Sequence, residues 1–230
     1  MKRYNNTHLW LLIPFAVAVL GFIPSYWLRF FEVPWRHHVH GLTATLWFIL
    51  LITQPYLISR GRRDAHRRFG MLALIVAGAV VASGINLVPY NLVNDRIPEF
   101  ARFGLSFVDV VLVPGFALAV IMAVLRSKQT DDHAHWMIST VFWAVSPALF
   151  RLLLGPAFAL GAESFDAVVP YVLGSTGVVN IVVLAFLMFR ERRMHPAYVL
   201  AALGSIVLFL PTVVGNMGWW RAIASAVFTV

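Results

Sequence analysis

Seven apolar runs, each about as long as a bilayer is thick, limit most strongly how this chain can fold. A hydrocarbon core about 30 Å thick is crossed by a helix of roughly 20 apolar residues. Runs of this kind lie near residues 8–29, 38–58, 69–89, 103–126, 134–156, 167–189 and 197–218. The connections between them are short, polar and rich in arginine, and none is long enough for a soluble domain. The sequence therefore predicts one all-α, polytopic transmembrane helical bundle over residues 1–230, with about seven spans.

The composition excludes several classes of protein. Only 12% of the residues are charged and 60% are hydrophobic, whereas soluble domains contain about 25% charged residues. An ordinary soluble globule, an acidic disordered chain and a nucleic-acid binder are excluded, and the expected surroundings are a lipid bilayer. The chain has no cysteine, so an Fe–S cluster, a thiolate metal site and a covalently attached haem are excluded as well.

The positive charges predict the orientation of the bundle, because cytoplasmic loops carry an excess of lysine and arginine. The N-terminus and the connections after the second, fourth and sixth runs hold twelve of the eighteen basic residues: Lys2, Arg3, Arg60, Arg62, Arg63, Arg67, Arg68, Arg126, Lys128, Arg190, Arg192 and Arg193. We expect the N-terminus to be cytoplasmic and the C-terminus to lie outside. The first run is too long for a cleaved signal peptide and is predicted to be a signal-anchor helix.

Four polar residues within the runs are candidates for a functional site, because ionisable and amide groups are costly in lipid. Asp109 and Arg151 fall at similar depth in consecutive antiparallel spans, which predicts an ion pair. That pair is either a structural pin between helices or a proton or substrate site. Gln54 continues a polar stripe along the second run that is expected to face the bundle interior, and Asn180 is expected to join the same interior network.

The histidines form two clusters in the predicted topology. His37 and His40 lie near the outer end of the second run, while His66, His133 and His135 lie at the inner ends of later runs. Imidazole binds iron, copper and zinc, so each cluster is a candidate site for haem b or for a transition metal. Histidines that titrate near neutrality could instead relay protons or sense pH.

Short motifs give the chain a resemblance to a known group of proteins. They are His40-Gly41, Gln54-Pro55, His66-Arg67-Arg68-Phe69-Gly70 and His133-Ala134-His135-Trp136-Met137, followed by Arg151. Over roughly residues 37–153 they resemble an uncharacterised group of bacterial polytopic membrane proteins. The resemblance implies a multi-pass protein of the bacterial inner (plasma) membrane and marks six positions of interest: His40, Gln54, His66, Arg67, His133 and Arg151. The His-Arg-x-x-Gly element is also similar to one in membrane b-type cytochromes and ferric-reductase-like proteins.

Three functions remain open from the sequence. The first is a membrane protein that binds metal or haem through its histidines and acts in redox chemistry, as an oxidoreductase or otherwise. The second is a small transporter or proton-linked channel that uses Asp109 and Arg151. The third is a non-catalytic subunit of a larger membrane complex, and a homo-oligomer is a further expected assembly.

Overall fold

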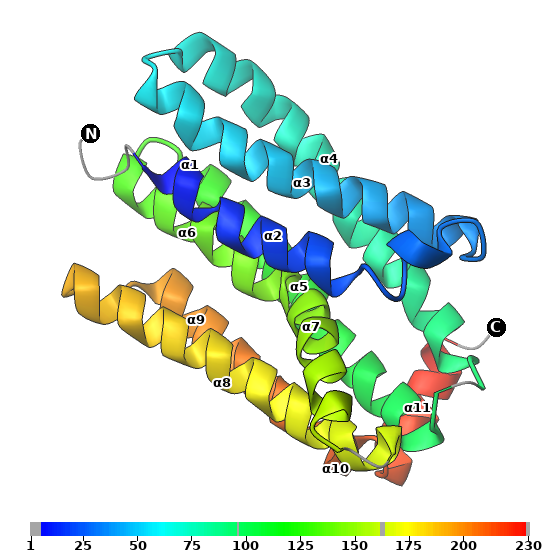
Figure 1. The fold of residues 1–230 in the computed structure, drawn as a ribbon. Helices are drawn as coiled ribbons and strands as arrows, with labels where there is room; N and C mark the ends of the chain where they lie inside the picture. The colour runs from blue at the N-terminus through cyan, green and yellow to red at the C-terminus, as the bar shows by residue number, and fades with distance from the viewer. Residues whose placement is uncertain (1–5, 96, 162–163, 229–230) are drawn as a thin grey trace.

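The computed structural model describes residues 6–95, 97–161 and 164–228, and these residues form helices and turns without any strand (Figure 1). The helices follow in the order α1 (Thr7–Trp10), α2 (Leu12–Gly21), α3 (Trp35–Ser59), α4 (Arg63–Leu92), α5 (Glu99–Leu125), α6 (Thr130–Ala144), α7 (Ser146–Ala159), α8 (Phe165–Glu191), α9 (Pro196–Ser205), α10 (Pro211–Val214) and α11 (Gly218–Phe228). Two 3-10 turns, η2 (Trp27–Arg29) and η3 (Ile206–Phe209), lie after α2 and after α9. The prediction of an all-α protein is confirmed for these residues.

Helices α3, α4, α5 and α8 are each long and apolar enough to cross a membrane. Helices α6 and α7 pass the same test together but are bent by 43°, so they form a fifth span if the bent pair crosses as one. The four to five candidate spans are consistent with an integral membrane protein. The predicted first and seventh runs form shorter apolar helices, Thr7–Gly21 and Pro196–Phe209, so the count of seven and the orientation of the termini stay predictions.

Proline and loop signals account for the interruptions. Helix α2 ends at Gly21, and Pro24 follows within the turns that lead to α3. The bend between α6 and α7 centres on Val145, two residues before Pro147. Proline lacks the N–H that would bond the carbonyl four residues earlier, and its ring clashes with that carbonyl. The last apolar run breaks at Pro211 for the same reason.

The connections α3–α4, α5–α6 and α8–α9 lie together at the left of Figure 1, at the end of the bundle that also holds the start of α1. The α4–α5 connection and α11 lie at the opposite end. We call these the basic end and the far end, because the first three connections and the helix turns beside them carry nine of the sixteen arginines of the sequence. The arrangement is the one that the charge pattern predicts for a cytoplasmic and an outer face.

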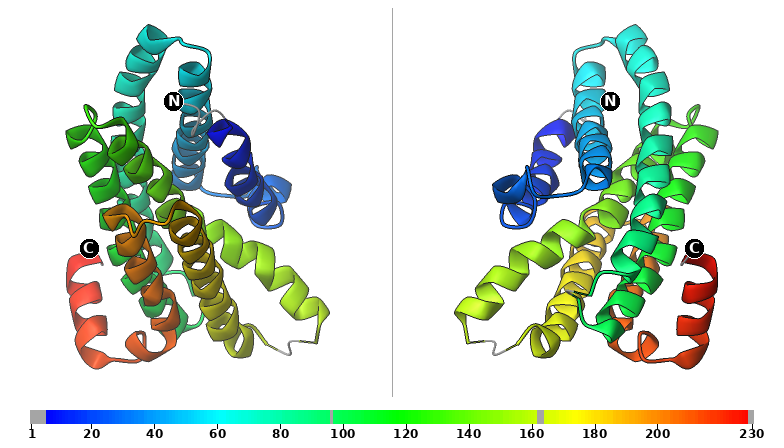
Figure 2. Two further views of the ribbon diagram at one scale, coloured as in Figure 1. Left: turned by 90° about the vertical axis from the view of Figure 1, so that its left-hand side faces the viewer. Right: turned by 90° about the vertical axis from the view of Figure 1, so that its right-hand side faces the viewer.

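Helix pairs α3–α4 and α5–α6 pack along their lengths, α9 packs on α6, and α8 packs on α7 and α9 (Figures 1 and 2). Trp143 of α6 is inserted between α5 and α9. A Cβ atom at Gly115 of α5 or at Gly204 of α9 would collide with the ring of Trp143. These two glycines therefore let three helices approach around one indole. Helix α2 packs on α7, where the main chain at Gly21 touches that of Ala148.

Candidate functional site

One group of ionisable side chains lies within the bundle, toward its far end. Three helices contribute His37 and His40 (α3), Asp109 (α5) and Arg151 (α7), which we call the far-half cluster. The charge of Arg151 lies within electrostatic range of all three other residues. Asp109, Arg151 and the two histidines therefore lie in the same half of the bundle, where the charge of Arg151 acts on the other three.

Asp109 and Arg151 are neighbours without a direct contact. No ion pair of 4.0 Å or less joins the two side chains, both of which belong to the described residues. Instead, Arg151 donates from Nη1 to the carbonyl of Pro147 at 2.8 Å, and its guanidinium lies 4.6 Å from the ring centroid of Phe22. The predicted ion pair between Asp109 and Arg151 is therefore not formed, because the guanidinium bonds the main chain of its own helix and lies over Phe22.

His40 is held by a hydroxyl that the sequence analysis missed. Its Nδ1 lies 3.0 Å from Oγ of Ser83 on α4, and the same oxygen lies 3.1 Å from Oγ1 of Thr43. Gly84 lies beside the imidazole, since a Cβ atom there would be in ordinary van der Waals contact with Cε1 of His40, at 3.5 Å. A serine inside an apolar helix gives little signal in sequence, because its hydroxyl usually bonds its own main chain.

A second pair of histidines lies at the basic end. The rings of His66 (α4) and His133 (α6) lie 6.3 Å apart between centroids and are nearly perpendicular. Nδ1 of His133 donates to the carbonyl of Ala123 at 2.8 Å, which leaves Nε2 with a free lone pair. This is the tautomer in which a histidine ligates a metal through Nε2.

Gln54 contacts His66, so two residues that the sequence singled out meet. With the Gln54 amide in the orientation that satisfies both of its ends, its nitrogen donates to Nδ1 and, at 3.2 Å, to the main-chain oxygen of His66, while its oxygen accepts from the N–H of Gly70 at 2.8 Å. A donor at Nδ1 leaves the proton of a neutral His66 on Nε2, and a metal at Nε2 would require Gln54 to turn over. Arg67 follows His66 on an exposed turn of α4.

The described residues contain no group of three or more His, Cys, Asp or Glu side chains that could hold a metal ion. In particular, His135 does not form a three-ligand group with His66 and His133, because it points to another face of α6. A structural zinc site takes four protein ligands and a catalytic one takes three. Of the predicted ligands, the structure thus pairs only His66 with His133.

His135 is fully buried and bonds Glu191, a residue that the sequence analysis missed. Its Nε2 lies 2.5 Å from Oε2 of Glu191 at the end of α8, and its Nδ1 lies 2.7 Å from the main-chain oxygen of Asp131. Both ring nitrogens therefore face oxygen acceptors. A proton must lie on each contact, either as an imidazolium beside a carboxylate or as a neutral imidazole beside a protonated Glu191. The only sequence signal for Glu191 is that it is the single acid among three arginines, Arg190, Arg192 and Arg193.

His195 stacks on His135, with ring centroids 4.3 Å apart. Its Nδ1 accepts from the N–H of Ala197 and caps α9, so Nε2–H donates to Oδ1 of Asp132 at 3.3 Å. Burial, and then the charge of the stacked His135, hold the pKa of His195 below its ordinary value, while Asp132 acts in the opposite direction. The contact with Asp132 therefore offsets only part of the effect of burial on the pKa of His195.

Arg193 ties the α8–α9 connection to the start of α6. It bonds Asp131 at 2.7 Å and Asp132 at 3.2 Å, and Arg126 lies 3.6 Å from Asp132. Asn180, in contrast, serves the bend: its amide donates to Oγ of Ser146 at 2.9 Å, at the first residue of α7. Asn180 therefore makes a contact between α8 and α7 and belongs to neither the His66–His133 pair nor the His135–His195 stack.

The chain matches no protein-family model, no curated protein and no solved structure.

Proposed function

We propose that this integral membrane protein moves protons through its helical bundle, alone or together with a solute, and that the far-half cluster is the intramembrane part of the path. The observation that supports the proposal is the arrangement of Asp109 and Arg151. The two opposite charges lie in the same half of the bundle without closing into a contact. Two histidines share their surroundings.

Energetics favour a transport role over a structural pin. A charged side chain within a membrane costs several kcal/mol, and such residues mark ion and proton pathways. A pin would offset that cost by a close, fully hydrogen-bonded pair. Here Arg151 donates its hydrogen bond to a carbonyl of its own helix. Because no hydrogen bond from Arg151 holds Asp109 in its charged form, we infer that Asp109 can gain and lose a proton. His40 and Ser83 continue the polar chain toward α4.

The experiment uses the purified chain in liposomes that contain a pH-sensitive dye, with a potassium diffusion potential as the driving force. We expect wild-type vesicles to take up protons and Asp109→Asn to lose the flux by about tenfold or more, because the amide cannot carry a proton. Asp166→Asn is the matched control, since Asp166 is an exposed carboxylate at the first turn of α8. Its flux should equal that of the wild type.

Two outcomes would contradict the proposal. Wild-type vesicles that conduct no faster than empty ones under either polarity would remove the transport role. Equal flux in wild type and in a folded Asp109→Asn would remove Asp109 from the path. Size-exclusion profiles and thermal unfolding in detergent establish that each variant is folded.

A second candidate function is a haem or metal centre for membrane redox chemistry at the basic end. It is favoured by one observation, the perpendicular rings of His66 and His133 with the free Nε2 of His133. Two imidazoles that share one metal ion in a line have their centroids about 6 Å apart, given metal–nitrogen bonds of about 2 Å. Haem b is the better fit than a bare ion, because its macrocycle supplies the remaining ligands and two histidines suffice.

An absorption spectrum with elemental analysis of the purified protein tests this candidate. Haem would give a Soret band that His133→Ala abolishes and His38→Ala, at the far end, preserves. A featureless spectrum without stoichiometric metal excludes the candidate. A non-catalytic subunit would give neither proton flux nor a metal signal.

A further inference from the structure

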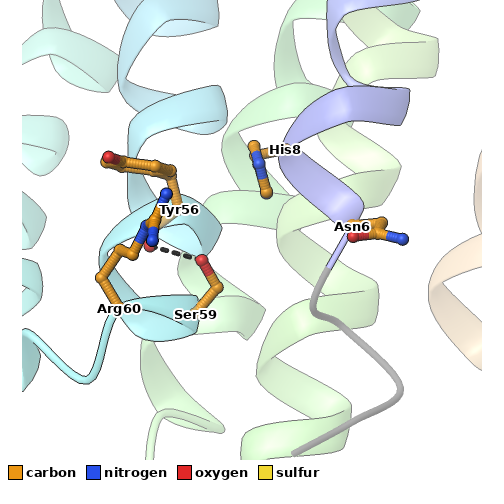
Figure 3. A pocket seen from close by; sticks show the side chains of 5 residues that line it. All are labelled: Asn6, His8, Tyr56, Ser59 and Arg60. Atoms are coloured by element: carbon orange, nitrogen blue, oxygen red, sulfur yellow. Dashed lines mark hydrogen bonds between the residues drawn. The ribbon is translucent and has the colours of Figure 1, made fainter.

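An open, polar pocket of about 320 Å³ lies at the basic end, between the start of α1 and the last turn of α3 (Figure 3). Five residues line it: Asn6, His8, Tyr56, Ser59 and Arg60. None of them is acidic. None of the residues of the His66–His133 pair, the His135–His195 stack or the far-half cluster lines this pocket.

The lining residues present hydrogen-bond donors and a fixed positive charge. The guanidinium of Arg60 lies 5.3 Å from the ring centroid of Tyr56, and the edge of the His8 ring contacts the same phenol at 5.5 Å. Tyr56 thus contacts both the guanidinium and the imidazole at one wall. Ser59 turns its hydroxyl onto the carbonyl of Tyr56 at 2.7 Å, so its oxygen is left as an acceptor.

Two of these groups lack partners within the described chain. Arg60 makes no ion pair there, although other arginines of the basic end, such as Arg126 and Arg193, do. Nδ1 of His8 is buried and has no hydrogen-bond partner. An unpaired guanidinium beside a buried, unsatisfied imidazole nitrogen is suited to an anion with several acceptor oxygens, and arginine binds phosphate through two parallel hydrogen bonds.

The segment that carries His8 also exposes apolar side chains. Trp10 in α1 is 61% exposed and Ile13 in α2 is 56% exposed. Their apolar side chains would lie along acyl chains, and tryptophan is typical of the membrane interface. Basic pockets at the cytoplasmic side of a bundle bind anionic lipid headgroups.

We propose that this pocket binds the phosphate of an anionic phospholipid headgroup, with Arg60 as the main contact and His8 and Asn6 as further donors. The chemistry is that of a phosphate ester, which a free phosphate shares. The exposed apolar side chains of the segment that carries His8 favour the lipid.

The test measures thermal unfolding of the detergent-purified chain during titration with phosphatidylglycerol, phosphatidylcholine or inorganic phosphate. We expect phosphatidylglycerol to raise Tm at concentrations where the other two have no effect. Arg60→Gln should weaken the apparent affinity about tenfold, the effect of losing a bidentate phosphate contact. Arg62→Gln is the matched control, because Arg62 lies two residues further along the same connection and does not line the pocket.

Each outcome either supports or contradicts a lipid site at this pocket. An Arg60-dependent response to phosphatidylglycerol alone supports the lipid site. An Arg60-dependent response to inorganic phosphate overturns the lipid as the ligand. Equal losses in Arg60→Gln and Arg62→Gln, or equal responses to the two lipids, overturn the site itself and leave a diffuse field of positive charge.

Discussion

At the scale of single residues, the stacked pair of His135 and His195 gives the bundle a defined response to acid. The pKa of His195 is lowered by burial and by His135, whereas in an unfolded chain it is about 6.5. At a pH between the pKa of His195 in the folded chain and its pKa in the unfolded chain, His195 binds a proton only when the chain is unfolded. The free energy of unfolding contributed by His195 is therefore fully present above about pH 6.5 and falls as the pH drops below it.

We predict that Tm in detergent decreases from about pH 7.5 to about pH 5.5 and that His195→Asn makes this dependence shallower. Asparagine cannot titrate, yet its side-chain oxygen can still accept the N–H of Ala197 as a helix cap. His38→Asn, at the far end, should keep the wild-type slope. The same slope in wild type and in His195→Asn would show that other groups cause the acid response.

Residues differ in how far their contacts could be predicted. That Asp109 and Arg151 lie in the same half of the bundle could be predicted from sequence, because depth along a helix follows from counting residues, whereas the predicted ion pair between them is not formed. The contacts of His135 with Glu191 and of His40 with Ser83 could not be predicted, because they depend on how α8 and α4 rotate about their axes. That rotation is set by packing of the whole bundle and leaves no local pattern.

At the scale of helices, the central spans could be predicted closely and the ends could not. Helices α3, α4, α5 and α8 agree with their apolar runs, because length and hydrophobicity determine them. The bend at Val145 was missed, although Pro147 stands beside it, since proline is also tolerated inside transmembrane helices. Five helices of this chain contain such an interior proline: α3, α4, α5, α7 and α8.

The contact of α5, α6 and α9 around Trp143 predicts where the packing is least tolerant. Gly115→Ala should destabilise the protein by about 1–3 kcal/mol, because the added methyl group collides with the indole. Gly78→Ala is the matched control: nothing lies within 4 Å of its added Cβ, and alanine should favour the helix by about 1 kcal/mol. Thermal unfolding in detergent should therefore show shifts of opposite sign, and shifts of the same sign would contradict the packing.

At the scale of the whole molecule, the separation of a basic end from a far end predicts the topology. The chain contains no cysteine, so single cysteines can be placed without background. In intact bacterial cells, a membrane-impermeant maleimide should label Asn94→Cys and Asn216→Cys, near the far end, but not Lys128→Cys. Lysis should expose Lys128→Cys.

The reverse pattern would mean that the basic end faces outward. If Asn216→Cys were labelled only after lysis, α11 and the α4–α5 connection would lie on opposite sides of the membrane. In the structure, Trp220 of α11 packs with Leu92 at the end of α4. The second result would therefore contradict the packing of the far end as well as the orientation.

The short apolar helices at both ends of the chain have a consequence for the membrane itself. Thr7–Gly21 and Pro196–Phe209 are each about 21–23 Å long at 1.5 Å per residue, less than the roughly 30 Å of a hydrocarbon core. Such hydrophobic mismatch is relieved when lipids compress locally, at a cost of fractions of a kcal/mol per Å. We expect the bilayer to be thinner beside α2, which packs on α7, the helix that carries Arg151. The dielectric barrier to an ion would be thinnest there.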